Sequence, residues 1–233
     1  MKRYVKNSLW IRLVFYFLVL TISGRCIKKT TSNEIFKDDF NRDNSSSTLG
    51  SNWTLSLPAG TTFTINNSMA KPLGSNATTE AALPSALYNK KVTGSFKVSA
   101  KFTISGIADY DSMGYLIARS AAMDIPTDAY LCGYYFDTTT VAPNKKYYFT
   151  LRKIASNVSY EIAKVAMHQL TSGKSDTITF TIDNTTLKCE ISGNSTVSIT
   201  TTDSSFGDGY AGIMGGGNNT PYLFFDDFLI EKL

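Results

Sequence analysis

The stretch GSFKVSAKFTI, residues 94–104, decides the fold because its apolar and polar side chains alternate along the chain. Successive side chains of a β-strand point to opposite faces, so this segment has one apolar face and one face of lysine, serine and threonine. The pattern therefore predicts a strand with one buried side. The apolar face consists of Phe96, Val98, Ala100, Phe102 and Ile104.

Similar segments recur about every ten residues, with turn signals such as Asp183-Asn184 between them, and helical periodicity is nearly absent. This spacing predicts an all-β domain, a sandwich of two antiparallel sheets. Residues 71–84 are small and polar and predict a surface loop, and residues 207–217 are rich in glycine. The expected strands cover residues 35–40, 53–57, 61–65, 95–104, 112–120, 128–137, 145–154, 160–167, 176–182, 187–191, 196–200 and 222–233.

The N-terminal 25 residues differ in composition from the rest of the chain. A basic start is followed by the apolar run LVFYFLVLTI, residues 13–22, and then by the small pair Ser23-Gly24. This order is typical of a secretory signal peptide, and the run is shorter than the ~20 residues of a membrane span. A retained signal anchor is the alternative if Leu9 and Trp10 belong to the run. We expect a signal peptide at 1–25, a tether at 26–34 and one domain at 35–233.

Cys26 is a candidate lipidation site, because ISGRC at 22–26 resembles a bacterial lipobox. The stretch departs from that pattern at Arg25, where glycine or alanine normally stands. Simple cleavage after Ser23 or Gly24 is the alternative. Both routes predict export, either to the outer surface or periplasm as a lipoprotein or as a secreted protein. Contact with a membrane is then expected only through the leader or a lipid anchor.

The basic net charge of the chain comes from the leader. The whole chain has 23 Lys and Arg against 19 Asp and Glu, and residues 1–25 contribute five of the basic ones. Without them the counts are 18 and 19, so the domain is close to neutral. Nucleic-acid binding depends on a basic surface, so we expect no nucleic-acid partner.

Cys132 and Cys189 each lie inside an expected strand. Export would permit a disulfide between them, but a disulfide needs Cα atoms within about 7 Å of each other, which the sequence does not reveal. Two alternatives therefore stay open, a disulfide or two buried free thiols on different strands. The sequence favours the free thiols.

The order and spacing of several segments resemble the concanavalin A-like lectin and glucanase superfamily, with its bacterial laminin-G-like members as the nearest match. The resemblance covers nearly the whole chain from Ile35 onward. It implies a jelly roll of two curved antiparallel sheets with the first and last strands side by side. The superfamily includes lectins, carbohydrate-binding modules, glycosidases and adhesion domains, so the fold does not define the function. The segments are IFKDDFNR (35–42), MGYLIAR (113–119), AYLCGYYF (129–136), TITFTIDNTTLKCEISG (177–193) and FFDDFLIEKL (224–233).

The chain lacks the residue patterns of the common hydrolases. Glycosidases need two carboxylates beside the scissile bond, and the glucanases that this chain resembles carry them as Glu-x-Asp-x-x-Glu on one strand. None of its five glutamates stands in that pattern. The single histidine, His168, comes without a nucleophile elbow and with too few companions for a zinc site. We therefore expect no catalysis, and a glycoside-active enzyme ranks last among the functions considered.

Pairs of aspartates stand near both ends of the domain, at 38–39 and 226–227. If the first and last strands are neighbours, these carboxylates crowd together, and a calcium ion would relieve the repulsion. Glucanases of the superfamily hold a structural calcium with the chain start, a loop glycine carbonyl and a last-strand aspartate. The alternative is that these acids protect edge strands from pairing with other chains. The implied calcium ligands are Asp38, Asp39, Gly50 and Asp227.

Tyrosines and arginines are frequent on the middle strands. Sugars are bound by flat rings that stack on pyranose faces beside polar groups, although strand tyrosines also belong to cores. We expect a non-catalytic binding module for a glycan, or alternatively a surface adhesion or structural domain that binds protein partners, without a redox cofactor. The candidate ligand-binding residues are Tyr115, Arg119, Tyr130, Tyr134, Tyr148 and Arg152.

Overall fold

The computed structural model describes residues 33–45, 48–74, 80, 83–105, 113–124, 126–136, 147–166, 173–192, 197–216 and 222–233. The leader at 1–25, the tether residues 26–32 with Cys26, and His168 lie outside the described residues. The described part consists of strands and their connections and contains no α-helix, which confirms the all-β prediction. Across these ranges, no helix is long and apolar enough to span a membrane.

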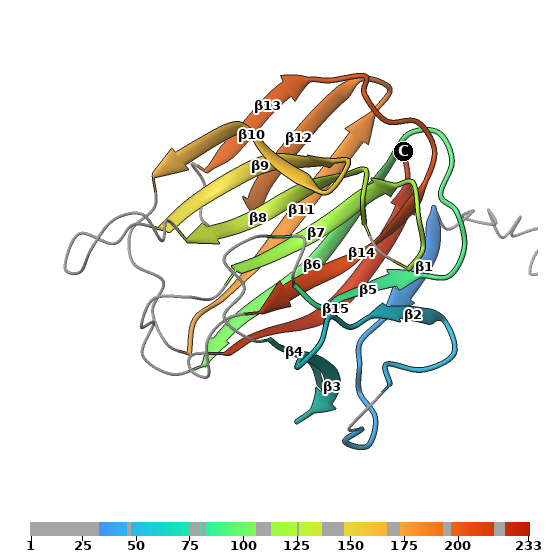
Figure 1. Ribbon diagram of the computed structural model, residues 1–233, viewed down its shortest axis with the longest axis vertical. Helices are drawn as coiled ribbons and strands as arrows, with labels where there is room; N and C mark the ends of the chain where they lie inside the picture. The colour runs from blue at the N-terminus through green and yellow to red at the C-terminus, as the bar shows by residue number, and fades with distance from the viewer. Residues whose placement is uncertain are drawn as a thin grey trace, which may run out of the picture. The chain divides into compact units, whose positions relative to one another are not determined.

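The described residues form fifteen strands in two antiparallel sheets (Figure 1). The strands are β1 (Glu34–Asp38), β2 (Trp53–Ser56), β3 (Thr62–Asn66), β4 (Met69–Leu73), β5 (Ser85–Tyr88), β6 (Phe96–Ser105), β7 (Met113–Ser120), β8 (Ala129–Phe136), β9 (Tyr147–Ala155), β10 (Val158–Ala166), β11 (Ser175–Asp183), β12 (Thr186–Ser192), β13 (Ser198–Thr202), β14 (Tyr210–Gly216) and β15 (Tyr222–Lys232).

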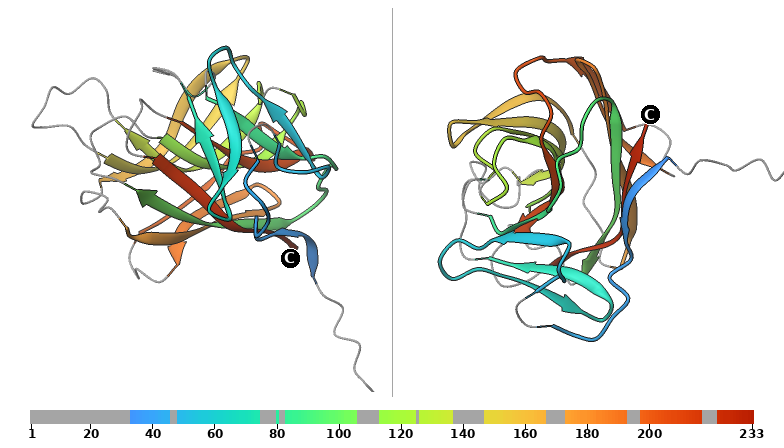
Figure 2. Two further views of the ribbon diagram at one scale, coloured as in Figure 1. Left: turned by 90° about the horizontal axis from the view of Figure 1, so that it is seen from below. Right: turned by 90° about the vertical axis from the view of Figure 1, so that its right-hand side faces the viewer.

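The two sheets face each other and confirm the predicted sandwich (Figure 2). Among the described strands, the eight-stranded sheet has the order β13-β12-β11-β6-β15-β4-β3, and β1 also pairs with β15. The seven-stranded sheet has the order β10-β9-β8-β7-β14-β5-β2. Each sheet combines consecutive strands with neighbours from distant parts of the chain, such as β6 with β15 and β5 with β14, as in a jelly roll.

The first and last strands are neighbours, as predicted. In the pairing of β1 with β15, Phe36 lies opposite Ile230 and Asp38 lies opposite Phe228. On its other side β15 pairs with β6, so it lies inside the eight-stranded sheet. The alternative that the aspartates of β15 protect an edge strand is therefore wrong.

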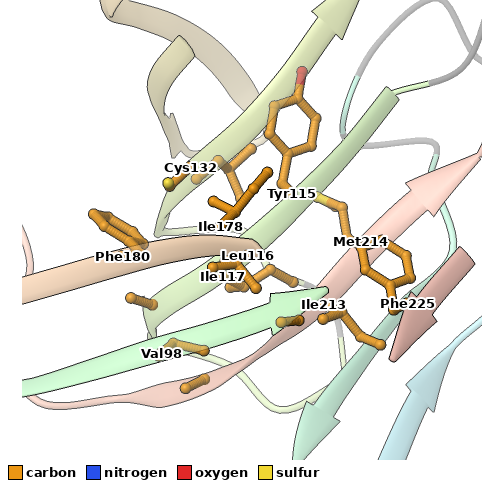
Figure 3. Close-up of a cluster of buried hydrophobic side chains, with 14 of the residues drawn as sticks. Val98, Tyr115, Leu116, Ile117, Cys132, Ile178, Phe180, Ile213, Met214 and Phe225 are labelled. Carbon is orange, nitrogen blue, oxygen red and sulfur yellow. The ribbon is translucent and has the colours of Figure 1, made fainter. Parts of the chain in front are cut away.

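The alternating segment at 94–104 forms β6, between β11 and β15 in the eight-stranded sheet. Its apolar side chains are buried between the sheets, which confirms the predicted half-buried strand. Val98 lies opposite Phe180 of β11, and Figure 3 shows both in one buried cluster with Ile213 of the opposite sheet. Burying an apolar side chain of this size contributes about 1.5–3 kcal/mol, so this face of β6 is a large part of the core.

Three strands, β4, β5 and β14, occupy stretches where the sequence predicted no strand. The expected surface loop at 71–84 is wrong at its start, since β4 continues to Leu73 and pairs with β3. The glycine-rich stretch contains β14, which lies between β7 and β5. A Cβ atom on Gly212 would lie 2.0 Å from the carbonyl oxygen of Ala86, so a glycine is required for β5 to approach β14.

A disulfide joins the two sheets through the core. Cys132 of β8 and Cys189 of β12 lie on opposite sheets with their Cα atoms 5.7 Å apart, and both are fully buried. The free thiols that the sequence favours are therefore wrong. The two cysteines are 57 residues apart in the chain, so their distance is set by the packing of one sheet on the other.

Two tyrosines on the inner side of β8 form hydrogen bonds to aspartates from distant parts of the chain. The hydroxyl of Tyr134 donates to Asp176 Oδ2 at 2.8 Å, and the hydroxyl of Tyr130 donates to Asp203 Oδ1 at 2.6 Å. Burial and the nearby carboxylate raise the pKa of both phenols, to about 12 for Tyr130. Burial would raise the pKa of Asp203, but hydrogen bonds from Ser205 and Tyr130 outweigh it and hold that pKa low. Both phenols therefore stay protonated donors at neutral pH.

We predict that the Cys132→Ala/Cys189→Ala variant folds but is less stable. The closed loop spans 57 residues, and the loop-entropy relation gives a loss of about 4 kcal/mol in the free energy of unfolding. Urea unfolding, followed by the fluorescence of the buried Trp53, measures this loss. A reductant should lower the midpoint of the parent to that of the variant. A variant as stable as the oxidised parent would contradict the prediction.

Candidate functional site

The candidate site lies on the outer face of the seven-stranded sheet, the face turned away from the eight-stranded sheet. Because Cys132 points into the core, its neighbours Leu131 and Gly133 point outward, as do the residues paired with them in β7 and β9. The outer face therefore carries Tyr115, Ile117, Tyr135, Tyr148, Thr150 and Arg152.

A buried ion pair holds the centre of this face. Arg152 Nε lies 2.7 Å from Glu80 Oε1, with the two side chains 10% and 4% exposed. The Tyr115 hydroxyl donates to the same Glu80 oxygen at 3.3 Å. Burial and the charge of Glu80 raise the pKa of Tyr115 well above its usual value, so the phenol stays a donor. The buried carboxylate is thus compensated by one cation and one hydroxyl group.

The accessible part of the site lies along β8, β9 and β10. The guanidinium carbon of Arg152 lies 4.4 Å from the centroid of the Tyr135 ring, and Lys164 Nζ lies 4.6 Å from the centroid of the Tyr148 ring. Glu161 Oε2 lies 3.8 Å from Arg152 Nη1 and 3.0 Å from Lys164 Nζ. Both rings are half-buried, and Glu161 and Lys164 are exposed. We call the following set the outer-face cluster: Glu80, Tyr115, Tyr135, Tyr148, Arg152, Glu161 and Lys164.

Three of the six ligand-binding residues expected from the sequence, Tyr115, Tyr148 and Arg152, belong to the outer-face cluster. Tyr130 and Tyr134 do not, because they share the inner side of β8 with Cys132. The structure therefore does not bring these two predicted ligand-binding residues to the surface that carries Tyr148. A difference of one position along a strand changes the face that a side chain occupies.

Arg119 also lies apart from the cluster. Its side chain is buried, and Arg119 Nη1 donates to the carbonyl oxygen of Phe206 at 3.1 Å. Its backbone has φ 55°, where the pairing of β7 with β14 is irregular. Arg119 therefore holds the connection that leads into β14, which is a structural role.

The sequence did not point to four members of the cluster: Glu80, Tyr135, Glu161 and Lys164. Tyr135 could have been found, because the alternation along β8 places it on the same face as Leu131, which is opposite Arg152, while Tyr135 itself is opposite Tyr148. Glu80 had none, because it lies outside the strands and reaches Arg152 only through the tertiary fold. Glu161 and Lys164 lie on β10 on either side of a register shift. Their positions differ by three, so a strict period of two would place them on opposite faces, although they share one.

Of the implied calcium ligands, Asp38 has partners within the chain itself. The Asp38 carboxylate accepts hydrogen bonds from Arg42 Nη1 at 2.7 Å and from Trp53 Nε1 at 2.7 Å. Burial would raise the pKa of Asp38, but the hydrogen bonds from Arg42 and Trp53 lower it. Arg42 also donates to the carbonyl oxygen of Leu49, the residue before Gly50. The Arg42 guanidinium thus connects Asp38 to the backbone beside Gly50, which are two of the positions that the calcium ion was expected to connect.

The remaining implied ligands, Asp39 and Asp227, belong to a region of like charge. Burial raises the pKa of Asp226, and the charges of Asp227 and Asp39 raise it further. Asp227 has φ 49°, where the register between β15 and β6 shifts. Among the described residues, no group of three or more His, Cys, Asp or Glu side chains is arranged to hold a metal ion. A calcium site at these residues stays a prediction.

No protein-family model matches the sequence, and neither does any curated protein. Solved structures with similar folds include the carbohydrate-binding module CBM66 from Bacillus subtilis, with 15% identity, a TM-score of 0.56, and coverage of 78% of this chain and 96% of that one. The exoplasmic/lumenal domain of VIP36 in its Ca2+/Man-bound form has 12% identity, a TM-score of 0.58, and coverage of 81% and 88%. A Bacillus subtilis protein of unknown function with a galectin-like fold has 13% identity, a TM-score of 0.58, and coverage of 85% and 96%. The fold is therefore the concanavalin A-like jelly roll that the sequence resembles.

We predict that Arg152→Met destabilises the protein strongly, because it leaves the buried Glu80 carboxylate without its cation. The free energy of unfolding should fall by about 3–5 kcal/mol, and the double variant Glu80→Leu/Arg152→Met should recover most of it. Lys164→Met is the matched control, since it removes an exposed cation, whose pair with Glu161 and contact with the Tyr148 ring are each worth at most about 1 kcal/mol. Thermal and urea unfolding measure all three variants. An effect of Arg152→Met no larger than that of Lys164→Met would contradict the prediction.

Proposed function

We propose that this chain is a non-catalytic carbohydrate-binding module whose glycan binds at the accessible part of the outer-face cluster. The observation that carries the proposal is the pair of half-buried rings, Tyr135 and Tyr148, which lie opposite each other on β8 and β9 beside three charged side chains. The similar folds of the carbohydrate-binding module CBM66 and of the VIP36 domain in its Ca2+/Man-bound form support the class of ligand.

The chemistry of the rings suits a sugar. A pyranose has an apolar C–H face and a rim of hydroxyl groups, so it is bound by a flat ring together with charged or polar partners for the hydroxyls. Tyr135 and Tyr148 supply the flat surfaces, and Glu161 and Lys164 supply an acceptor and a donor beside them. The cations over both rings hold them in place, which reduces the entropy lost on binding.

The cluster does not suit glycoside hydrolysis. A glycosidase needs one carboxyl group free to donate a proton and a second free to act as nucleophile or base. Glu80 is engaged by Arg152 and Tyr115, and Glu161 is engaged by Lys164 and Arg152. Release of reducing sugar from a mixture of polysaccharides would favour the enzyme alternative over binding alone.

A second candidate, a surface adhesion domain that binds a protein partner, is favoured by exposed apolar side chains on β10. Val158 is 51% exposed and Tyr160 is 48% exposed, on a strand that forms one edge of the seven-stranded sheet. Edge strands with exposed apolar side chains are common places for another chain to pair or pack. Tyr160 pairs with Lys153, on the side of the hairpin away from the rings.

We predict that Tyr148→Ala and Tyr135→Ala each weaken glycan binding at least about tenfold, which corresponds to about 1.4 kcal/mol. Tyr160→Ala is the matched control, since it removes an exposed tyrosine of the same hairpin that does not face the cluster. The mature domain and its variants would be measured on a glycan array, then by calorimetry with the glycan found. Equal losses in all three variants, or an array on which nothing binds, would contradict the proposal. Loss of protein capture in Tyr160→Ala alone would favour the adhesion domain.

Export and calcium are separate parts of the proposal. The signal peptide at 1–25 predicts a mature chain that lacks it, and mass spectrometry of the N-terminus distinguishes an acylated Cys26 from simple cleavage. Support for calcium at Asp38, Asp39, Gly50 and Asp227 comes from the resemblance and from the crowded carboxylates.

For calcium we predict that a chelator lowers the melting temperature and that added calcium restores it, because the ion would offset the repulsion among these carboxylates. Magnesium is the matched control ion. An unchanged melting temperature would mean that Arg42 supplies the positive charge at this end of the domain by itself.

A further inference from the structure

The sequence carries an excess of one short motif that neither the fold nor the outer-face cluster explains. Eight of its 15 asparagines are followed two residues later by serine or threonine, with no proline between. Serine and threonine make up 53 of the 233 residues, so chance placement would give only about three such asparagines. The motif Asn-x-Ser/Thr is the acceptor of N-linked oligosaccharide in exported proteins. The asparagines are Asn44, Asn52, Asn66, Asn76, Asn157, Asn184, Asn194 and Asn218.

Four of these motifs lie wholly within described residues, and in two of them the asparagine stands in an exposed turn between two paired neighbouring strands. Asn157 is in the two-residue turn between β9 and β10, and Asn184 is in the turn between β11 and β12. Both asparagines are exposed and have positive φ angles of 66° and 52°, which direct the turn away from the sheets. Turns of this kind accept a bulky polar group without displacing any side chain of the core.

From these observations we infer that the exported chain is N-glycosylated at Asn157 and Asn184. The Nδ2 atom forms a bond to the anomeric carbon of an oligosaccharide, whose bond to a polyprenyl pyrophosphate breaks. Nδ2 loses one proton in this transfer, and the lipid pyrophosphate is the leaving group. Asn184 Nδ2 donates to Asp183 Oδ1 at 3.2 Å, and it keeps one N–H for this contact after modification.

The two turns lie at the same end of the sandwich. Asp203 connects them, because its N–H donates to the carbonyl oxygen of Thr185 at 2.9 Å and its carboxylate accepts from Lys153 near the end of β9. Tyr148 lies near the start of β9, seven residues before Ala155, which is about 23 Å of strand. Attached oligosaccharides therefore stand away from the rings proposed to bind a free glycan. The sequence between Asn76 and Asn157, which forms β5 to β9, contains no such motif.

The inference rests on the proposed export but not on the proposed glycan binding. The test begins with the chain purified from the cells that naturally produce it. Peptide mapping by mass spectrometry, with and without a peptide N-glycosidase, should show oligosaccharide on Asn157 and Asn184. Asn33 is exposed and lacks the motif, so it should be unmodified. A chain that has lost its leader but carries two unmodified asparagines would overturn this inference. A chain that retains its leader would instead overturn the export proposal, and with it this inference.

A matched pair of variants checks that the motif itself is responsible. Thr186 is exposed and lies two residues after Asn184. Thr186→Ser keeps the motif and should keep the oligosaccharide, whereas Thr186→Ala should lose the oligosaccharide on Asn184 and migrate faster in gel electrophoresis by one glycan step. Neither variant replaces Asn184, so the residue that adopts the positive φ angle in this turn is unchanged. A difference in mobility between the two variants therefore reflects the motif and not the fold. Equal mobility of Thr186→Ala and the parent would overturn the assignment to Asn184.

Discussion

The attachment of β8 to the opposite sheet is the constraint on which the rest of the structure depends. Three alternate residues of this strand, Tyr130, Cys132 and Tyr134, point inward and each is joined to a distant part of the chain. One link is covalent and two are hydrogen bonds to carboxylates, and a hydrogen bond to a charged partner is about twice as strong as a neutral one. These links fix the inner side of β8 and so determine which side chains occupy its outer side.

The outer-face cluster follows directly from that constraint. With Cys132 inside, Tyr135 and its partner Tyr148 are outside, and the Arg152 guanidinium lies against the Tyr135 ring. A buried arginine needs a carboxylate, which Glu80 supplies from outside the strands. The accessible end of the cluster is therefore built on a rigid, fully paired base. A rigid base of this kind is what a binding site needs in order to lose little entropy when a ligand arrives.

Where β1 pairs with β15, several carboxylates lie close together, and their charge is compensated in a different way. β1 and β15 bring several aspartates together, and the chain places Arg42 and the indole of Trp53 against one of them, Asp38. A bidentate guanidinium satisfies a carboxylate in a planar geometry, and it needs no ion from solution. The same aspartates therefore have different environments: Asp38 is well compensated, while Asp226 carries a raised pKa.

The sequence by itself determined the class of fold. Alternation in segments such as 94–104 fixes strands, strand spacing fixes a two-sheet sandwich, and the resemblance placed β1 beside β15, because these properties are local or depend on order along the chain. Only the tertiary structure decided the pairing of Cys132 with Cys189 and the membership of the outer-face cluster. Both depend on which face of a strand meets the other sheet, and a period of two defines two faces without saying which one is buried. Glu80 could not have been found from the sequence at all, since its partner Arg152 is 72 positions away and only packing brings them together.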